Sequence, residues 1–184
     1  MPAFKPHGVE VARVPMNELS SDPLIRSYRT WRAWCGDRSA PEWRDVDLMA
    51  LPPPVLPLMS VVDVLDGGRD YRYRYWGSRL TELFGRDETG SLLSDHVVVE
   101  SGELRTGQFD TVVNEVGPAL FVTKFLKFKG IAAEKVNLRL PVCDMPGEVT
   151  KILTICAVSP NILRRGYNLA EYLDGNWAGE IRSF

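Results

Sequence analysis

The order of strand and helix patterns over residues 58–160 constrains the fold more than any other feature of this sequence. Two strand patterns come first, short helical patterns and one longer helix follow, and three strand patterns come last. Short turns join the last three strands, so we expect them to be consecutive antiparallel neighbours. Five strands in one sheet, with the helices collected on one face, make an α+β domain. The expected strands are 58–65, 71–76, 119–126, 133–142 and 149–159, and the expected longer helix is 101–116.

Apolar and polar residues alternate most regularly along residues 135–140. Successive side chains of a strand point to opposite faces of the sheet. We therefore expect Leu138 and Leu140 to point toward the helices, and we expect Asn137 to point outward.

The segments that flank this domain differ in character. The first 21 residues hold three prolines and no persistent period, which is typical of a flexible arm. Asp22 and Pro23 indicate a helix start, and apolar residues recur at helical spacing as far as Cys35. The chain therefore divides into a flexible N-terminal arm (1–21), an amphipathic helix with a Pro-rich connector (22–57), the α+β domain (58–160) and a C-terminal tail (161–184).

The charge balance excludes several classes of partner. The chain has 22 Lys and Arg against 24 Asp and Glu, a formal charge of −2, so no bulk positive field attracts a nucleic acid or an anionic membrane. Its apolar runs are far shorter than the roughly 20 residues that cross a bilayer. No secretory signal peptide is visible near the start, so we expect a cytoplasmic protein.

The cysteines and the sequence motifs give little sign of metal binding or catalysis. Cys35, Cys143 and Cys156 are an odd number without a CxxC pair, which is typical of free thiols and gives no zinc site. No Gly-x-Ser-x-Gly elbow, His-Glu-x-x-His motif or P-loop is present, so we assign no catalytic residue. We interpret the acidic pair Asp87 and Glu88 as a solvated turn.

The element order and several short motifs resemble the PAS domain, and in particular the bacterial PAS-like proteins in which a helix precedes the sheet. The resemblance covers about residues 22–160. It implies a five-stranded antiparallel sheet and a sensory or regulatory role in signal transduction. The motifs that carry it are Tyr-Arg-Tyr-Trp-Gly-Ser at 73–78, Phe-Gly-Arg-Asp at 84–87, Thr-Gly at 89–90 and Leu-Arg-Leu-Pro-Val at 138–142.

Apolar side chains on different elements point to a small-molecule site in such a domain. The expected fold brings them around one space, and apolar walls with few polar groups are typical of ligand pockets. Aromatic residues at this spacing also fill cores, so a filled core is the alternative. The candidate ligand-binding residues are Tyr75, Phe84, Phe109, Phe121 and Leu138.

The cofactor, if there is one, is not identified by the sequence. No cysteine lies in the context that a covalent flavin sensor requires. His96 lies just before the expected longer helix, where an axial ligand of a b-type haem would come from. The alternative is a histidine on the surface or at a helix cap.

We expect a single-domain sensory or regulatory module that binds a small molecule, a signalling protein or both. The alternatives are an enzyme or carrier that uses the same cavity, and a structural interaction module with a filled core. Apolar surface on helix 22–35 extends from Trp31 around to Trp34, so we expect a homodimer through this helix. The competing explanation is that the helix lies on the outer face of its own sheet.

Overall fold

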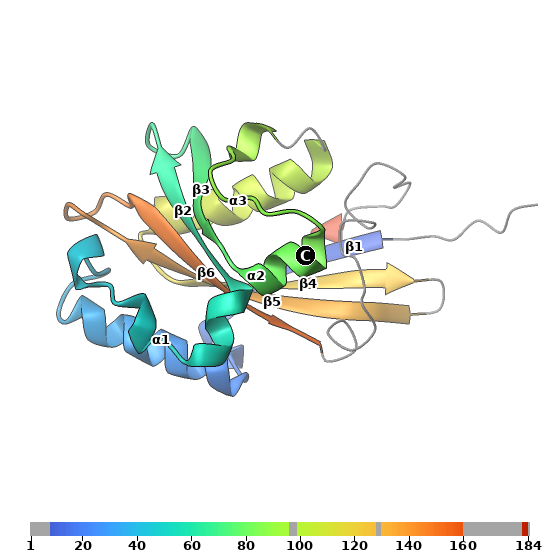
Figure 1. Cartoon of the computed structure of the whole chain (residues 1–184), viewed down its shortest axis with the longest axis horizontal. Coiled ribbons are helices and arrows are strands. Elements are labelled where there is room, and N and C mark those ends of the chain that lie inside the picture. The colour runs from blue at the N-terminus through green and yellow to red at the C-terminus, as the bar shows by residue number, and fades with distance from the viewer. Residues whose placement is uncertain (1–7, 96–98, 128–129, 160–181, 184) are drawn as a thin grey trace, which may run out of the picture.

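The structure is a computed structural model with an α+β fold, in which helices lie on both faces of an open sheet (Figure 1). It describes residues 8–95, 99–127, 130–159 and 182–183. In chain order, the strands are β1 (Gly8–Val14), β2 (Met59–Leu65), β3 (Asp70–Trp76), β4 (Ala119–Lys127), β5 (Gly130–Val142), β6 (Lys151–Val158) and β7 (Arg182–Ser183). Their order in the sheet is β3-β2-β6-β5-β4-β1-β7.

The helices of the described ranges connect these strands. Within those ranges, no helix has both the length and the apolar character that a membrane span requires. The α-helices are α1 (Asp22–Cys35), α2 (Ser78–Phe84) and α3 (Val99–Glu115), and the 3₁₀ helices are η1 (Met16–Glu18), η2 (Trp43–Asp45), η3 (Leu48–Ala50), η4 (Pro53–Leu58) and η5 (Leu93–Asp95).

The sheet holds the five expected strands, β2 to β6, and two more at one edge. Gly8–Val14 pairs antiparallel with β4, although the sequence predicted a flexible arm there. The nearest prolines, Pro6 and Pro15, lie outside this strand and so do not interrupt its ladder. The short strand β7 pairs in parallel with β1. The rest of the C-terminal tail, from 160 to 181 and at 184, lies outside the described residues.

The second half of strand β5, residues 137–142, is buried on both faces. Leu138 and Leu140 are 0% exposed and point toward α1, while Asn137 and Arg139 are 3% exposed and point toward α3. The prediction that Asn137 points outward is wrong, because α1 covers one face of the sheet while α2 and α3 cover the other (Figure 1). The expected collection of helices on one face is wrong for the same reason.

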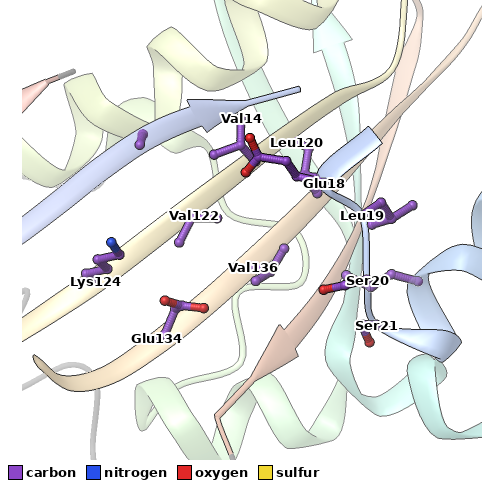
Figure 2. Close-up of a pocket in the computed structure, with 12 residues that line it drawn as sticks. Val14, Glu18, Leu19, Ser20, Ser21, Leu120, Val122, Lys124, Glu134 and Val136 are labelled. Carbon is purple, nitrogen blue, oxygen red and sulfur yellow. The ribbon is translucent and has the colours of Figure 1, made fainter. Parts of the chain in front are cut away.

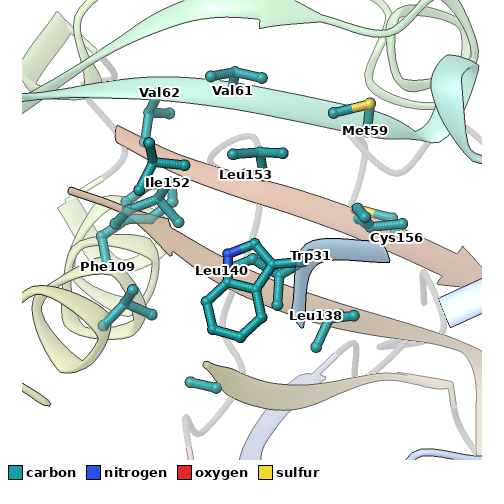
Figure 3. Close-up of a cluster of buried hydrophobic side chains, with 14 of the residues drawn as sticks. Trp31, Met59, Val61, Val62, Phe109, Leu138, Leu140, Ile152, Leu153 and Cys156 are labelled. Carbon is teal, nitrogen blue, oxygen red and sulfur yellow. The ribbon is translucent and has the colours of Figure 1, made fainter. Parts of the chain in front are cut away.

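Helix α1 has the predicted bounds and packs on its own sheet. Trp31 is fully buried, and its Nε1 donates a hydrogen bond of 2.9 Å to the carbonyl oxygen of Pro141 at the end of β5. Figure 3 shows the indole beside Leu138 and Leu140. Trp34 is only half-buried. The structure therefore places Trp31 in the core of the chain itself, as the competing explanation of this helix expected.

The Pro-rich connector forms three 3₁₀ helices, η2 to η4, and the last of them lies against the end of β3. A Cβ atom at Gly77 would lie 2.3 Å from the carbonyl oxygen of Pro57, so only glycine fits between β3 and α2. The hydroxyl of Tyr75 donates a hydrogen bond of 3.0 Å to the carbonyl oxygen of Leu56. These contacts fix the start of α2 relative to the sheet.

Replacing Leu138 by alanine tests the packing of α1 on β5. Because the side chain is fully buried, we expect Leu138→Ala to lower the free energy of unfolding by about 2–5 kcal/mol in denaturant melts. Met49→Ala is the control, since Met49 is 78% exposed, and its effect should stay within about 0.5 kcal/mol. A loss below about 1 kcal/mol for Leu138→Ala would contradict this register.

Candidate functional site

The side chains between the sheet and helices α2 and α3 form a mixed polar and aromatic layer, which we call the inner layer. Most of its members are buried, and they come from five strands and two helices. Both properties are typical of sites that hold a small molecule by a few polar groups. The described members that form the site are Ser60, Tyr71, Tyr73, Trp76, Phe84, Gln108, Phe109, Phe121, Lys135, Asn137, Arg139, Thr154 and Cys156.

Arg139 is the centre of the polar part of the inner layer. Its Nε and Nη2 atoms donate hydrogen bonds of 3.1 and 2.8 Å to Oε1 of Gln108, and its Nη1 donates one of 2.7 Å to Oγ1 of Thr154. The guanidinium lies 4.1 Å from the ring centroid of Phe109. These contacts offset the cost of removing the guanidinium from water. They also join α3 to both central strands, so the position of α3 depends on Arg139.

Tyr71 and Asp110 form a second link between the sheet and α3. The phenol of Tyr71 donates a hydrogen bond of 2.6 Å to the carboxylate of Asp110, and its ring lies 4.8 Å from that of Phe109. Burial and the neighbouring Asp110 carboxylate raise the pKa of the Tyr71 phenol far above its ordinary value. The phenol therefore stays protonated at physiological pH and acts as a donor, not as a general base.

Asn137 and Cys156 pair across the two central strands. The thiol of Cys156 donates a hydrogen bond of 3.1 Å to Oδ1 of Asn137, and both side chains are buried. The pair places an amide and a thiol in the same layer as Arg139.

Trp76 carries the one buried side-chain nitrogen or oxygen, among the residues that the structure describes, for which no hydrogen-bond partner is found. The residue is 8% exposed, and its Nε1 is the atom without an acceptor. Its ring makes edge contacts with Tyr73 at 5.0 Å and Phe84 at 5.6 Å. A buried donor without a partner costs about 1–3 kcal/mol. An acceptor from a bound molecule would remove that cost.

The structure brings three of the predicted ligand-binding residues into the inner layer. Phe109 lies under the Arg139 guanidinium, and Phe84 lies against Trp76. Phe121 is buried on β4 opposite Asn137. The predicted haem ligand His96 lies outside the described residues.

The other two predicted residues, Tyr75 and Leu138, lie on the opposite face of the sheet. Leu138 points toward α1, and Tyr75 is bonded to η4. The ladder between β2 and β3 shifts between Val61, which pairs with Tyr75, and Val62, which pairs with Tyr73. This β-bulge places an extra residue in β3, so Tyr73 and Tyr75 face opposite sides.

Sequence reasoning missed the residues that give the inner layer its chemistry. Trp76 and Arg139 were noted only as parts of short motifs. Only the β-bulge, which the sequence does not show, places Trp76 toward α2. The solvated turn predicted at Asp87 and Glu88 is wrong for Glu88, which is buried and accepts hydrogen bonds of 3.1 and 3.0 Å from Arg86.

Neither metal ligands nor comparisons with known proteins identify what the site binds. In the part of the chain that the structure describes, no group of three or more His, Cys, Asp or Glu side chains could hold a metal ion. Comparison of the chain with protein-family models, with curated proteins and with solved structures gave no match. The chemistry of the inner layer is therefore the basis for a functional proposal.

Removing the Gln108 amide tests the role of Arg139 in holding α3. Gln108→Leu leaves two guanidinium N–H groups without their acceptor, so we expect a loss of about 1.5–3 kcal/mol in the free energy of unfolding. Asn114→Leu on the same helix is the matched control, because Asn114 is exposed. Equal effects of the two variants in denaturant melts would show that the Arg139 contacts do not stabilise the position of α3.

Proposed function

We propose that this chain is a single-domain PAS-like sensory or regulatory module in signal transduction, which binds a small molecule in the inner layer. The motifs shared with PAS-like proteins and the order of two strands, helices and three strands support the family. The three free cysteines, all of them buried, are compatible with a cytoplasmic location.

The main observation in favour of ligand binding is that Nε1 of Trp76 has no hydrogen-bond partner. A ligand that fits it carries a hydrogen-bond acceptor, such as a carbonyl, carboxylate or ring nitrogen. The neighbouring rings of Tyr73 and Phe84 favour a ligand whose body is apolar or planar. We therefore propose a small molecule that is largely apolar and has an acceptor at its edge.

The titratable groups of the inner layer favour sensing over catalysis. An enzyme would need a group whose pKa is moved toward physiological pH. The pKa of Tyr71 is moved the other way, to a value at which the phenol does not release its proton. The Arg139 guanidinium is held by an amide and a hydroxyl. These groups position α3.

Strand β5 contacts both α2 and α3, so a ligand that shifts one contact can change the packing of both helices. Lys135 Nζ lies 4.8 Å from the ring centroid of Phe84 at the end of α2, and Arg139 on the same strand holds α3. A ligand that moves Phe84 therefore acts on a strand that also positions α3. This arrangement suits a module whose output is a change in helix packing.

Native mass spectrometry of the purified chain, with and without the Trp76 donor, tests this function. We expect the parent protein to carry a noncovalent small molecule, and we expect Trp76→Phe to lose most of that mass while it remains folded. Trp34→Phe is the matched control, because Trp34 lies on α1 at the other face of the sheet, and it should keep the bound molecule.

The same experiment tests the filled-core alternative, and an absorbance spectrum of the bound species tests for haem. A parent protein without bound mass, which also takes up nothing from a cell extract, would favour the structural interaction module with a filled core. A Soret band in the bound species would instead indicate haem, with His96 as the candidate axial ligand.

We also propose a homodimer, which forms through the partly exposed side of α1. Trp31 is not available for it, but Trp34 and Tyr28 are only half-buried. We expect light scattering at micromolar concentration to give the mass of a dimer, and we expect Trp34→Ser to give the mass of a monomer. A monomeric parent protein would contradict the homodimer and leave the ligand proposal unaffected.

A further inference from the structure

A pocket of about 310 Å³ lies on the face of the sheet opposite the inner layer (Figure 2). Its floor is formed by β1, β4 and β5, and its wall by residues 18–21 and the first turn of α1. Helix α1 packs against β5 and β6, whereas β1 lies two strands beyond β5, at the far side of β4. The pocket therefore exists because β1 extends the sheet beyond the part that α1 covers.

Much of the floor of the pocket is apolar. Val14, Val122 and Val136 come from three adjacent strands and are only half-buried, although they point to the same side as the fully covered Leu138. Leu24 on α1 closes one side. Half-buried valines in a concavity favour an apolar group that completes their burial.

One end of the floor carries two opposite charges. Lys124 on β4 and Glu134 on β5 are directly paired in the ladder, and both line the pocket (Figure 2). No salt bridge joins them to each other or to another residue in the described ranges. Directly opposed residues have Cβ atoms about 4.5–5.5 Å apart. Glu10 of β1 also pairs with Lys124 in the ladder, and Glu18 lines the other end of the pocket. Groups that can pair with a ligand's carboxylate and with its ammonium therefore lie beside an apolar surface.

We propose that this pocket binds a free α-amino acid with a large apolar side chain. The ligand's carboxylate pairs with the ammonium of Lys124, and its ammonium pairs with the carboxylate of Glu134. Its side chain lies over the valines and points toward Leu24. The ammonium and the carboxylate of an α-amino acid are separated by a single carbon atom, so both can reach side chains of neighbouring strands. The volume is at the small end of the range for ligand pockets, which suits one amino acid.

Calorimetric titration of the full chain with L-phenylalanine and L-leucine tests this site. We expect at least one of them to bind. We also expect the two analogues of L-phenylalanine that lack one charge, phenethylamine and 3-phenylpropionate, to bind at least about tenfold more weakly. Failure of both amino acids to bind at millimolar concentration would overturn the proposal, and so would equal binding of either analogue.

Variants of the pocket residues show where the amino acid binds. Lys124→Met and Glu134→Gln should each weaken binding by about tenfold or more, because each removes one charge pair. Arg29→Met is the matched control for a lost surface charge, since Arg29 is exposed on α1 outside the pocket. Trp76→Phe should leave the affinity unchanged. Loss of binding in Trp76→Phe with unchanged binding in Lys124→Met would show that the amino acid occupies the inner layer, which overturns this site and supports the proposed function.

Discussion

Residues 137–142 of strand β5 are paired on both edges and buried on both faces, and the rest of the structure is arranged around that double burial. Toward α1 it presents Leu138 and Leu140, which the Trp31 indole covers while its nitrogen donates to Pro141. Toward α3 it presents Asn137 and Arg139, whose side chains bond to Cys156 and Thr154 on β6 and to Gln108 on α3. A strand covered on both sides normally carries apolar residues on both. Here one side is polar, so its buried groups need hydrogen-bond partners, and the neighbouring strand β6 and helix α3 supply them.

The burial of β5 on both faces explains which features of the fold could be predicted from the sequence and which could not. The bounds of α1 follow from its start signals and its period, and the five central strands follow from alternation and turns. The direction of Asn137 does not follow, because alternation distinguishes two faces without showing that both are covered. The strand at Gly8–Val14 was missed because both strands that pair with it, β4 and β7, lie far along the chain. The β-bulge that separates Tyr73 from Tyr75 leaves no signal in residue types, and the predicted site was divided between two faces for that reason.

The two proposed binding regions use neighbouring residues of the same strand. Glu134 and Val136 line the pocket, while Lys135 and Asn137 belong to the inner layer. Their chemistry differs: the pocket offers charged groups of both signs beside valines, whereas the inner layer offers the buried Trp76 donor among aromatic rings. A sheet with helices on both faces has room for both. Either proposal can fail without the other, because they share a strand but no side chain.

The most direct test of the central claim is the NMR signal of the Trp76 indole N–H, assigned by its loss in Trp76→Phe. The spectrum is recorded on protein as purified and again after its small molecules have been removed by unfolding and refolding. If a ligand accepts a hydrogen bond from Nε1, the signal moves on removal of the ligand and its hydrogen exchange becomes faster. An identical chemical shift and exchange rate in the two samples would show that the donor meets no ligand, and would contradict small-molecule binding in the inner layer.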